Sequence, residues 1–251
     1  MSRYLGFFLA ALLLAPASHA APTRIAVASN FSAAMKALAS AYFKRSGQRI
    51  TAAYGSTGKH YAQIRHGAPF DALFAADVRR PQLLEQAGIG IAHSRFTYAI
   101  GRLALWSPKP GYVDPQGQIL QSGHFAHLAI ANPKLAPYGL AAQQVMQKRK
   151  LYAALRPRLV FGENIGQTYQ FVASGNVPLG FVAWSQLKRP QQQPSGSWWL
   201  VPTALHAAIE QQAILLTDNP VAAGFVAFVK SPAGKKILQQ FGYGLPGKTG
   251  E

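Results

Sequence analysis

The sequence predicts an α/β protein built as two lobes, and two observations lead to this prediction. Short β-rich runs alternate with amphipathic segments, which is the pattern of parallel strands joined by helices. The alternation is interrupted by a longer apolar run at residues 97–107 and then restarts. We therefore assign residues 21–100 and 204–251 to lobe 1, and residues 101–203 to lobe 2.

The first twenty residues predict a secretory signal peptide. Arg3 is followed by the apolar run YLGFFLAALLLA, and Ser18 and Ala20 place small residues where a signal peptidase cleaves, after Ala20. The alternative is a membrane anchor, but the apolar run is too short to span a bilayer comfortably. No Cys is present to carry a lipid anchor. The sequence thus predicts a soluble periplasmic protein of a bacterium that has an outer membrane.

The composition indicates a folded, strongly basic protein without thiol chemistry. Hydrophobic residues make up 49% of the chain, which is enough for a core, and the lack of Cys excludes disulfides and zinc–thiolate sites. Lys and Arg number 25 against 8 Asp and Glu, for a formal net charge of +17. Because these basic residues are scattered and no RNA-binding motif accompanies them, we expect a solvated surface that attracts small anions and binds no nucleic acid. A binder of nucleic acid or of an anionic surface would need a clustered basic face.

Lobe 1 is predicted to open with three strand–helix pairs and to be completed by the end of the chain. Apolar periodicity and the turn residues Gly47 and Gly67 set the boundaries of these elements. The expected strands are residues 23–29, 48–55 and 70–77, and the expected helices are residues 31–47, 56–67 and 79–89. The chain then returns with an apolar segment and two amphipathic helices, at residues 207–218, 219–230 and 232–241.

Lobe 2 is predicted from the same alternation. We read residues 97–107 as one longer apolar strand that leads toward it. The expected strands that follow are residues 127–133, 159–164 and 178–184, with helices at residues 139–155 and 166–175. The Pro- and Gln-rich residues 185–197 read as a surface loop.

The stretch YGSTGK resembles the end of a phosphate-binding loop. Such a loop needs Gly, four free residues, and then Gly-Lys-Ser/Thr. Ala53 stands where the first Gly should be, and His60 stands where the magnesium-binding hydroxyl should be. What remains is a small, hydroxyl-rich turn that opens a helix, and such a turn can present free backbone N–H groups to an anion.

Four predicted strand-to-helix turns share this chemistry. In a parallel sheet such turns lie at the carboxyl ends of the strands, where ligands gather, and each helix start carries unsatisfied N–H donors and a partial positive charge. Two helix starts from each lobe, facing across a cleft, would surround an oxyanion. The alternative is that Ser, Asn and Thr serve as ordinary helix caps and Tyr138 as a packing residue. The turns are residues 29–32, 55–58, 136–139 and 163–166.

Four longer segments carry a specific pattern in this order: AVASNFSAAMKALASAYFKRSG, GSTGKHYAQIRHGAPFDALFAAD, LAIANPKLAPYG and GENIGQTYQFVASGNVPLGFVAWSQ. In these segments, which span nearly the whole mature chain, the sequence resembles the molybdate-binding proteins of ABC transporters. The resemblance implies a periplasmic binding protein of type II-like fold, with a ligand cleft between two lobes. Each lobe is then a mostly parallel sheet flanked by helices.

The resemblance also implies the ligand and its site. The ligand is a tetrahedral oxyanion, molybdate or tungstate, held by hydroxyl and backbone N–H groups. No charged side chain touches it, and the molybdenum or tungsten atom has no direct protein ligand. The family's site falls on Ser29, Asn30, Ser56, Thr57, Tyr138 and Ile165.

One position departs from part of the family. Some members use a Tyr from the strand that here reads GFVAW, where this chain has Ala183. The chain resembles the subgroup with Asn in the first turn and Tyr in the third, so we expect Tyr138 to supply the missing hydroxyl. Lys59 is expected to act as a surface charge rather than as a contact.

The expected partners are the oxyanion and, transiently, a membrane ABC permease, with no cofactor and no enzyme activity, in a monomer. A binding protein for sulfate or phosphate is the nearest alternative, because it would share the four turns. An exported hydrolase is a more distant one. The chain has only eight carboxylate side chains and lacks the His-Glu-x-x-His and Gly-x-Ser-x-Gly motifs.

Overall fold

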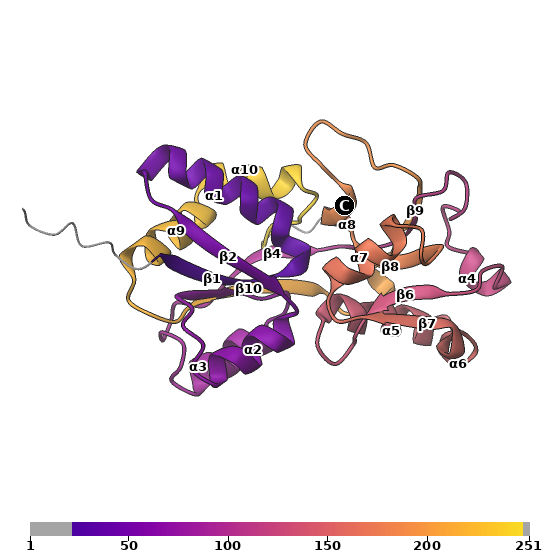
Figure 1. The fold of residues 1–251 in the computed structure, drawn as a ribbon, viewed down its shortest axis with the longest axis horizontal. Coiled ribbons are helices and arrows are strands. Elements are labelled where there is room, and N and C mark those ends of the chain that lie inside the picture. Colours follow the sequence, from indigo (N-terminus) through magenta and orange to yellow (C-terminus); the bar gives the residue numbers. More distant parts are fainter. Residues whose placement is uncertain (1–21, 248–251) are drawn as a thin grey trace, which may run out of the picture.

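A computed structural model describes residues 22–247 of the chain. It contains two five-stranded sheets with helices on their faces, arranged side by side as two lobes (Figure 1). The predicted two-lobe α/β fold is therefore confirmed. The predicted signal peptide, residues 1–20, lies outside the described residues.

Lobe 1 contains the sheet with strand order β2-β1-β3-β10-β4. Its strands are β1 (Thr23–Ala28), β2 (Ile50–Gly55), β3 (Ala72–Phe74), β4 (Phe96–Gly101) and β10 (Ile209–Leu215). In Figure 1, α1, α9 and α10 lie above this sheet, and α2 and α3 lie below it. These helices are α1 (Ser32–Ser46), α2 (Thr57–Arg65), α3 (Arg79–Gln86), α9 (Pro220–Lys230) and α10 (Pro232–Gln240). A 3-10 turn, η1 (Ser29–Phe31), joins β1 to α1.

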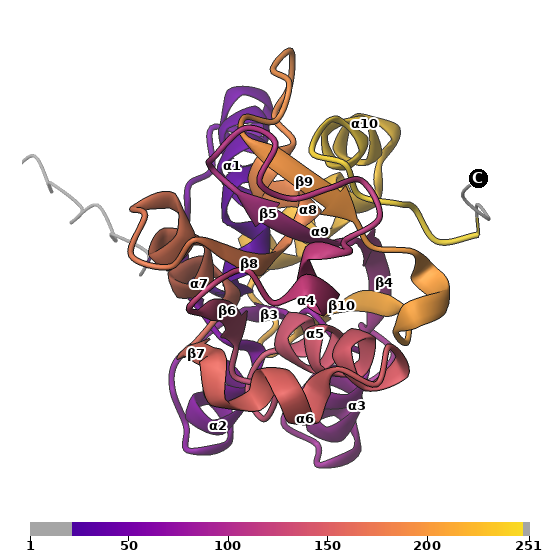
Figure 2. The same cartoon turned by 90° about the vertical axis from the view of Figure 1, so that its right-hand side faces the viewer.

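Lobe 2 contains the sheet with strand order β7-β6-β8-β5-β9. Its strands are β5 (Leu103–Ser107), β6 (Leu128–Ala131), β7 (Leu159–Gly162), β8 (Leu179–Ala183) and β9 (Ser197–Leu200). Figure 2 views this lobe from its outer end, with α5 and α6 on one side of the sheet. Its helices are α4 (Ile119–Ser122), α5 (Pro137–Lys148), α6 (Tyr152–Leu155), α7 (Ile165–Ala173) and α8 (Trp184–Leu187), with 3-10 turns η2 (Arg156–Arg158) and η3 (Thr203–Leu205).

Each sheet is buried on both faces, and alternate residues of a strand serve different cores. On β1, Ile25 and Val27 pack with α1 and α9, whereas Ala26 belongs to the core beneath α2 and α3. On β5, Leu105 and Trp106 likewise belong to opposite faces. This two-residue period is what a strand between two helical layers requires, and it explains why these strands read as continuous apolar runs.

Both sheets are mixed. Three strands of each run parallel, as the strand–helix alternation predicts, in the sets β2-β1-β3 and β7-β6-β8. The remaining two strands are antiparallel to their neighbours, and they are β10 and β4 in lobe 1 and β5 and β9 in lobe 2. Those four strands carry the chain across between the lobes. The chain passes from lobe 1 to lobe 2 between β4 and β5, and it returns between β9 and β10. The strands on either side of these two connections are the antiparallel ones.

The prediction of a single strand at residues 97–107 is wrong. The run divides at Arg102 into β4 and β5, which belong to different sheets. Both halves are apolar because each is a buried sheet strand, so periodicity did not reveal the break. Arg102 is thus one of the two places where the chain passes between lobes. The other is the segment between β9 and β10. The proposed lobe boundaries, after residues 100 and 203, stay a prediction.

Two further elements differ from the prediction. The helix predicted at residues 139–155 is interrupted between α5 and α6, where Lys150 adopts a left-handed φ of 59°. The region predicted as a surface loop, residues 185–197, begins with most of α8 and ends at the first residue of β9. Trp198 and Trp199 of β9 pack against the cores of lobe 2. This packing explains why part of the polar region forms regular secondary structure.

Residues 22–247 include no helix that combines the length and apolar character needed to cross a bilayer.

We predict that Phe31→Ala destabilises lobe 1 by about 3–5 kcal/mol, because it removes a large buried ring. Phe31 is fully buried in η1, and its ring centroid lies 4.7 Å from that of Tyr98 and 5.5 Å from that of Tyr243. Urea unfolding followed by circular dichroism measures the change. A loss below about 1 kcal/mol would show that the ring cluster behind this turn is not part of the stabilising core.

Candidate functional site

The structure brings all six predicted site residues to one small cavity between the lobes. Eleven residues line it, and none of them is charged. The cavity is small, with a volume of about 10 Å³. Its lining consists of Ala28, Ser29, Asn30, Gly55, Ser56, Thr57, Ala76, Ala136, Pro137, Tyr138 and Ile165.

The cavity lies where four helix starts converge. In lobe 1 the neighbouring parallel strands β1 and β2 lead into η1–α1 and α2. In lobe 2 the neighbouring parallel strands β6 and β7 lead into α5 and α7. Each sheet therefore contributes two adjacent strand ends, which is the position where α/β sheets bind ligands. The four turns predicted from the sequence are the ones that meet.

Three hydroxyl groups in the cavity wall share one arrangement. The Oγ of Ser29 accepts a hydrogen bond from Gly166 N (3.1 Å), and the Oγ1 of Thr57 accepts one from Ala76 N (3.0 Å). The Oγ of Ser56 caps α2 by accepting from Lys59 N (3.3 Å). None of these hydroxyls donates to another group within residues 22–247. Each oxygen is thus oriented by a backbone N–H, while its proton is left for a group in the cavity.

The Tyr138 hydroxyl has the same arrangement, with its oxygen accepting from an N–H group. The donor is Gln211 Nε2 (3.1 Å), and the side chain of Tyr138 is 1% exposed. Burial raises the pKa of the Tyr138 hydroxyl well above its usual value, so the group stays protonated at neutral pH. Tyr138 therefore combines the packing role that its size suggests with a proton that no group in the described chain accepts.

Backbone N–H groups add further donors. Thr57 and Ile165 are the first residues of α2 and α7, and Tyr138 is the second residue of α5. Amides at these positions have no acceptor within their own helix. The partial positive charge of each helix start reinforces them. The cavity wall is thus rich in neutral hydrogen-bond donors.

Asn30 has a different environment from the hydroxyls. Its side-chain Nδ2 donates to Gln211 Oε1 (2.8 Å) and to the Tyr243 hydroxyl (3.0 Å), and its backbone oxygen accepts from Ser185 Oγ (3.0 Å). Both amide protons are therefore committed inside the protein. The Oδ1 atom of Asn30 is buried and has no partner within the described residues. Asn30 thus ties the first turn to the interior behind it.

The lobes approach each other closely at two glycines of the site. Gly58 N donates across the interface to Leu135 O (2.9 Å), and a Cβ on Gly58 would lie 3.0 Å from the Leu135 backbone. A Cβ on Gly166 would lie 3.2 Å from the Ser29 Cβ. Arg80 Nη2 also crosses the interface, to Lys134 O (2.9 Å). These contacts describe a closed arrangement of the lobes, and they explain the second glycine of YGSTGK by close approach rather than by phosphate binding.

The charged groups near the cavity are paired with one another. Lys59 Nζ lies 2.8 Å from Glu163 Oε1 in the other lobe, and Arg80 pairs with Asp77. His60 lies behind the α2 turn, with Nε2 3.2 Å from Val27 O, and burial lowers its pKa so that the ring is neutral at pH 7. Within residues 22–247 no cluster of His, Asp and Glu could hold a metal ion.

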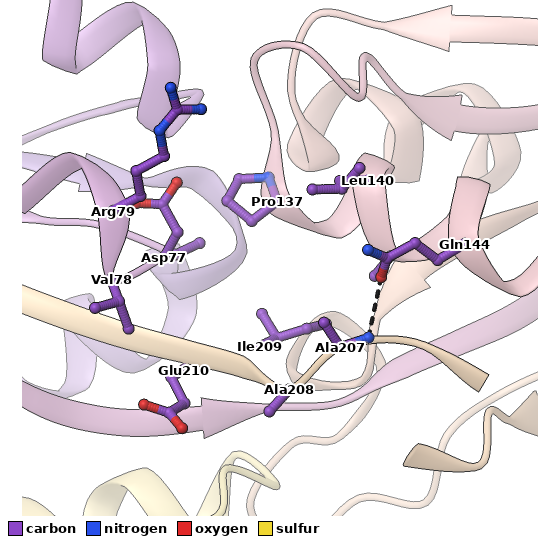
Figure 3. A pocket seen from close by; sticks show the side chains of 12 residues that line it. Asp77, Val78, Arg79, Pro137, Leu140, Gln144, Ala207, Ala208, Ile209 and Glu210 are labelled. Carbon is purple, nitrogen blue, oxygen red and sulfur yellow. Dashed lines mark hydrogen bonds between the residues drawn. The ribbon is translucent and has the colours of Figure 1, made fainter. Parts of the chain in front are cut away.

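A larger cleft of about 260 Å³ lies beside the small cavity and shares Ala76 and Pro137 with it. Figure 3 shows its wall, with Leu140 and Gln144 projecting from α5 and Asp77 and Glu210 from lobe 1. Gln144 Oε1 accepts from Ala207 N (3.0 Å). Its walls are mostly apolar and carry two carboxylates, Asp77 and Glu210, and one guanidinium, that of Arg79, so this cleft lacks the neutral donors of the small cavity. The small cavity is therefore the candidate site.

Several residues that support the site were not found from the sequence. They include the small lining residues Ala28 and Ala76, and the buried polar residues Ser185, Gln211 and Tyr243 behind them. The adjacent glutamines Gln211 and Gln212, in a strand whose other residues apart from Glu210 are apolar, were the one signal that could have revealed a polar interior. Small alanines carry no such signal.

Two lobes joined by crossing segments, with a small cavity between them walled by helix starts, define a protein that captures a small solute by lobe closure. The family profile described as bacterial extracellular solute-binding protein matches residues 23–244, and the chain belongs to that family.

Individual relatives are similar over nearly their full length. The chain is 49% identical to the molybdate-binding protein ModA of Azotobacter vinelandii over 240 residues, which cover 94% of this chain and 95% of the relative. It is 42% identical to the molybdate-binding protein ModA of Rhodobacter capsulatus, covering 87% and 86% of the two chains. The solved periplasmic molybdate-binding protein of Azotobacter vinelandii superposes with a TM-score of 0.87 at 38% identity, covering 89% of this chain and 99% of that one.

We predict that the Lys59–Glu163 pair contributes little to ligand affinity. Both side chains are about half exposed, at 52% and 44%, so water and salt screen their attraction. Lys59→Ala and Glu163→Gln should each change the binding free energy of the solute by less than about 1 kcal/mol. Titration calorimetry at low and high salt measures this. A more than tenfold loss in Lys59→Ala would mean that the ammonium group contacts the solute.

Proposed function

We propose that this protein captures molybdate, and also tungstate, in the periplasm and delivers it to a membrane ABC permease. The observation that carries the proposal is the convergence of the six predicted residues on one cavity whose hydroxyl protons are free. The relatives that are named for molybdate binding support the choice of ligand. In this proposal the metal atom reaches the protein only inside its oxyanion and has no direct protein ligand.

Neutral donors suit this task because the ligand is a dianion enclosed in a closed cleft. Each of its oxygens must be hydrogen-bonded, since an unmade bond to a buried charge is costly. Ser29, Thr57 and Tyr138 can offer hydroxyl protons, and the amides of Thr57, Tyr138 and Ile165 can offer N–H groups. Such donors stabilise the anion without a permanent opposite charge, which allows the ligand to leave when the lobes open.

Asn30 is given a supporting role in this proposal. Because both protons of its amide are committed to Gln211 and Tyr243, its side chain holds the η1 turn in place rather than donating to the anion. Asn30→Ala should therefore weaken binding and also destabilise the protein, through the buried groups that lose a partner.

Selectivity among tetrahedral dianions then follows from the size of the cavity. Sulfate has the charge and shape of molybdate but is smaller, so in a cavity sized for molybdate its hydrogen bonds would be long and weak. Binding of sulfate or phosphate is the alternative function, because a protein for those anions would use the same four turns with a different spacing between them.

Capture and release follow from lobe closure about the two crossing segments. The anion contacts donors from both lobes only when the lobes are closed, so its binding favours the closed form. The closed form is then recognised by the permease, which releases the anion. The protein is proposed to act as a periplasmic monomer with no cofactor, no catalytic activity of its own and no bound nucleic acid. Its basic surface speeds the arrival of anions.

Titration calorimetry of residues 21–251 against molybdate, tungstate, sulfate and phosphate tests the proposed function. We expect one-to-one binding of molybdate and tungstate that is tight, and sulfate binding that is weaker by more than a hundredfold. Tight binding of sulfate or phosphate would keep the capture mechanism and change the ligand. No measurable binding of any of the four anions would contradict the proposal.

We predict that Tyr138→Phe weakens molybdate binding by about 1–3 kcal/mol, the size of one hydrogen bond to a charged group. The ring and its packing are retained, but the buried Gln211 Nε2 loses its acceptor, so the melting temperature should also fall. Tyr112→Phe is a matched control, because the Tyr112 hydroxyl bonds to His124 O (3.3 Å) at the surface of lobe 2, away from the cavity. Equal affinity of Tyr138→Phe and the unaltered protein would remove this hydroxyl from the site.

A further inference from the structure

Given that the cavity binds an oxyanion, as proposed above, we infer that Gln211 is a positioning residue for that binding. It does not line the cavity, but its carboxamide joins two residues that do. The Oε1 atom accepts from Asn30 Nδ2 (2.8 Å), and the Nε2 atom donates to the Tyr138 hydroxyl (3.1 Å). Asn30 belongs to lobe 1 and Tyr138 to lobe 2, so one side chain links the two walls of the site.

The orientation of the Gln211 carboxamide follows from its neighbours. Oε1 also accepts from the Tyr98 hydroxyl (3.0 Å), which shares its one proton between Gln211 and Ala75 O (3.1 Å), and Gln211 is fully buried. Two donors on the oxygen leave the NH₂ group facing Tyr138. Because Nε2 can only donate, the Tyr138 oxygen is used as an acceptor and its proton is directed elsewhere. Gln211 thereby decides which way the Tyr138 hydroxyl donates.

Gly101 provides an independent observation. It ends β4 at the crossing between the lobes, and a Cβ built on it would collide with the Tyr138 hydroxyl and lie 2.6 Å from Gln211 Nε2. Only a residue without a side chain leaves room for this hydrogen bond. The close packing of Gly101, Gln211 and Tyr138 places the bond beside a segment about which the lobes move. The orientation of the Tyr138 hydroxyl therefore also depends on the small size of Gly101.

A double-mutant cycle with molybdate as the probe tests this role. Gln211→Met keeps the length of the side chain and removes both hydrogen-bonding atoms. It should weaken molybdate binding roughly tenfold, which corresponds to one hydrogen bond. In a Tyr138→Phe background the same change should cost clearly less, because no hydroxyl remains to be oriented and only the lost bond to Asn30 can still act. A merely structural Gln211 would cost the same in both backgrounds, and that result would overturn the inference.

Gln212→Met is the matched control. Gln212 is the next residue of β10 and is also nearly buried, but it bonds to Thr97 Oγ1 (3.0 Å) and Arg95 Nη1 (2.8 Å), away from the cavity. The molybdate affinity of Gln212→Met should stay within about twofold of that of the unaltered protein, since the loss of these two hydrogen bonds to remote partners leaves the site untouched. A tenfold loss in this control would show that any polar loss in β10 weakens binding, and would contradict a specific role for Gln211.

Gly101→Ala is a second variant that tests the same inference if Gln211→Met does not fold. The added methyl group should displace the Tyr138 hydroxyl and lower affinity. In a Tyr138→Phe background, which already lacks that hydroxyl, the same change should lower affinity much less. Additive losses would contradict the inference. Absence of molybdate binding in the unaltered protein would instead overturn the proposed function, and with it the role assigned to Gln211.

Discussion

The cavity depends on one constraint: every hydroxyl oxygen in its wall is occupied by a protein N–H, so every hydroxyl proton is available. The hydroxyl oxygens of Ser29, Thr57 and Ser56 accept from the backbone N–H groups of Gly166, Ala76 and Lys59, in that order. The Tyr138 oxygen accepts from the side-chain Nε2 of Gln211. Hydroxyl groups can both donate and accept, and this arrangement turns them into donors of fixed direction. A preorganised set of donors binds an anion without the cost of reorienting the wall.

The same hydrogen bonds explain why the site belongs to the closed form. The bond from Gly166 to Ser29 and the bond from Gln211 to Tyr138 both run between lobes. Opening the lobes would release these hydroxyls to face water and to lose their fixed direction. Affinity and closure are thus two consequences of one set of contacts, which is what a protein that must both hold and release its ligand requires.

The sequence was informative where local patterns decide the structure. Strand–helix alternation predicted most elements, and turn chemistry predicted which four turns meet. The individual residues Ser29, Thr57 and Ile165 were implied by the resemblance to molybdate-binding proteins. The prediction failed at Arg102, because an apolar run reads the same whether it forms one strand or two in different sheets. It also failed at Gln211, whose partners Asn30 and Tyr138 lie 181 and 73 residues away. Contacts at such separations are set by tertiary packing and leave no local pattern.

The most direct test of this account is the position of the bound metal. Crystals grown with molybdate, measured at the molybdenum absorption edge, should show one anomalous peak per chain, inside the cavity lined by Ser29, Thr57, Tyr138 and Ile165. The oxygens around that peak should contact only hydroxyl and N–H groups. A peak bound to Lys or Arg side chains on the basic surface, with none in the cavity, would contradict the account.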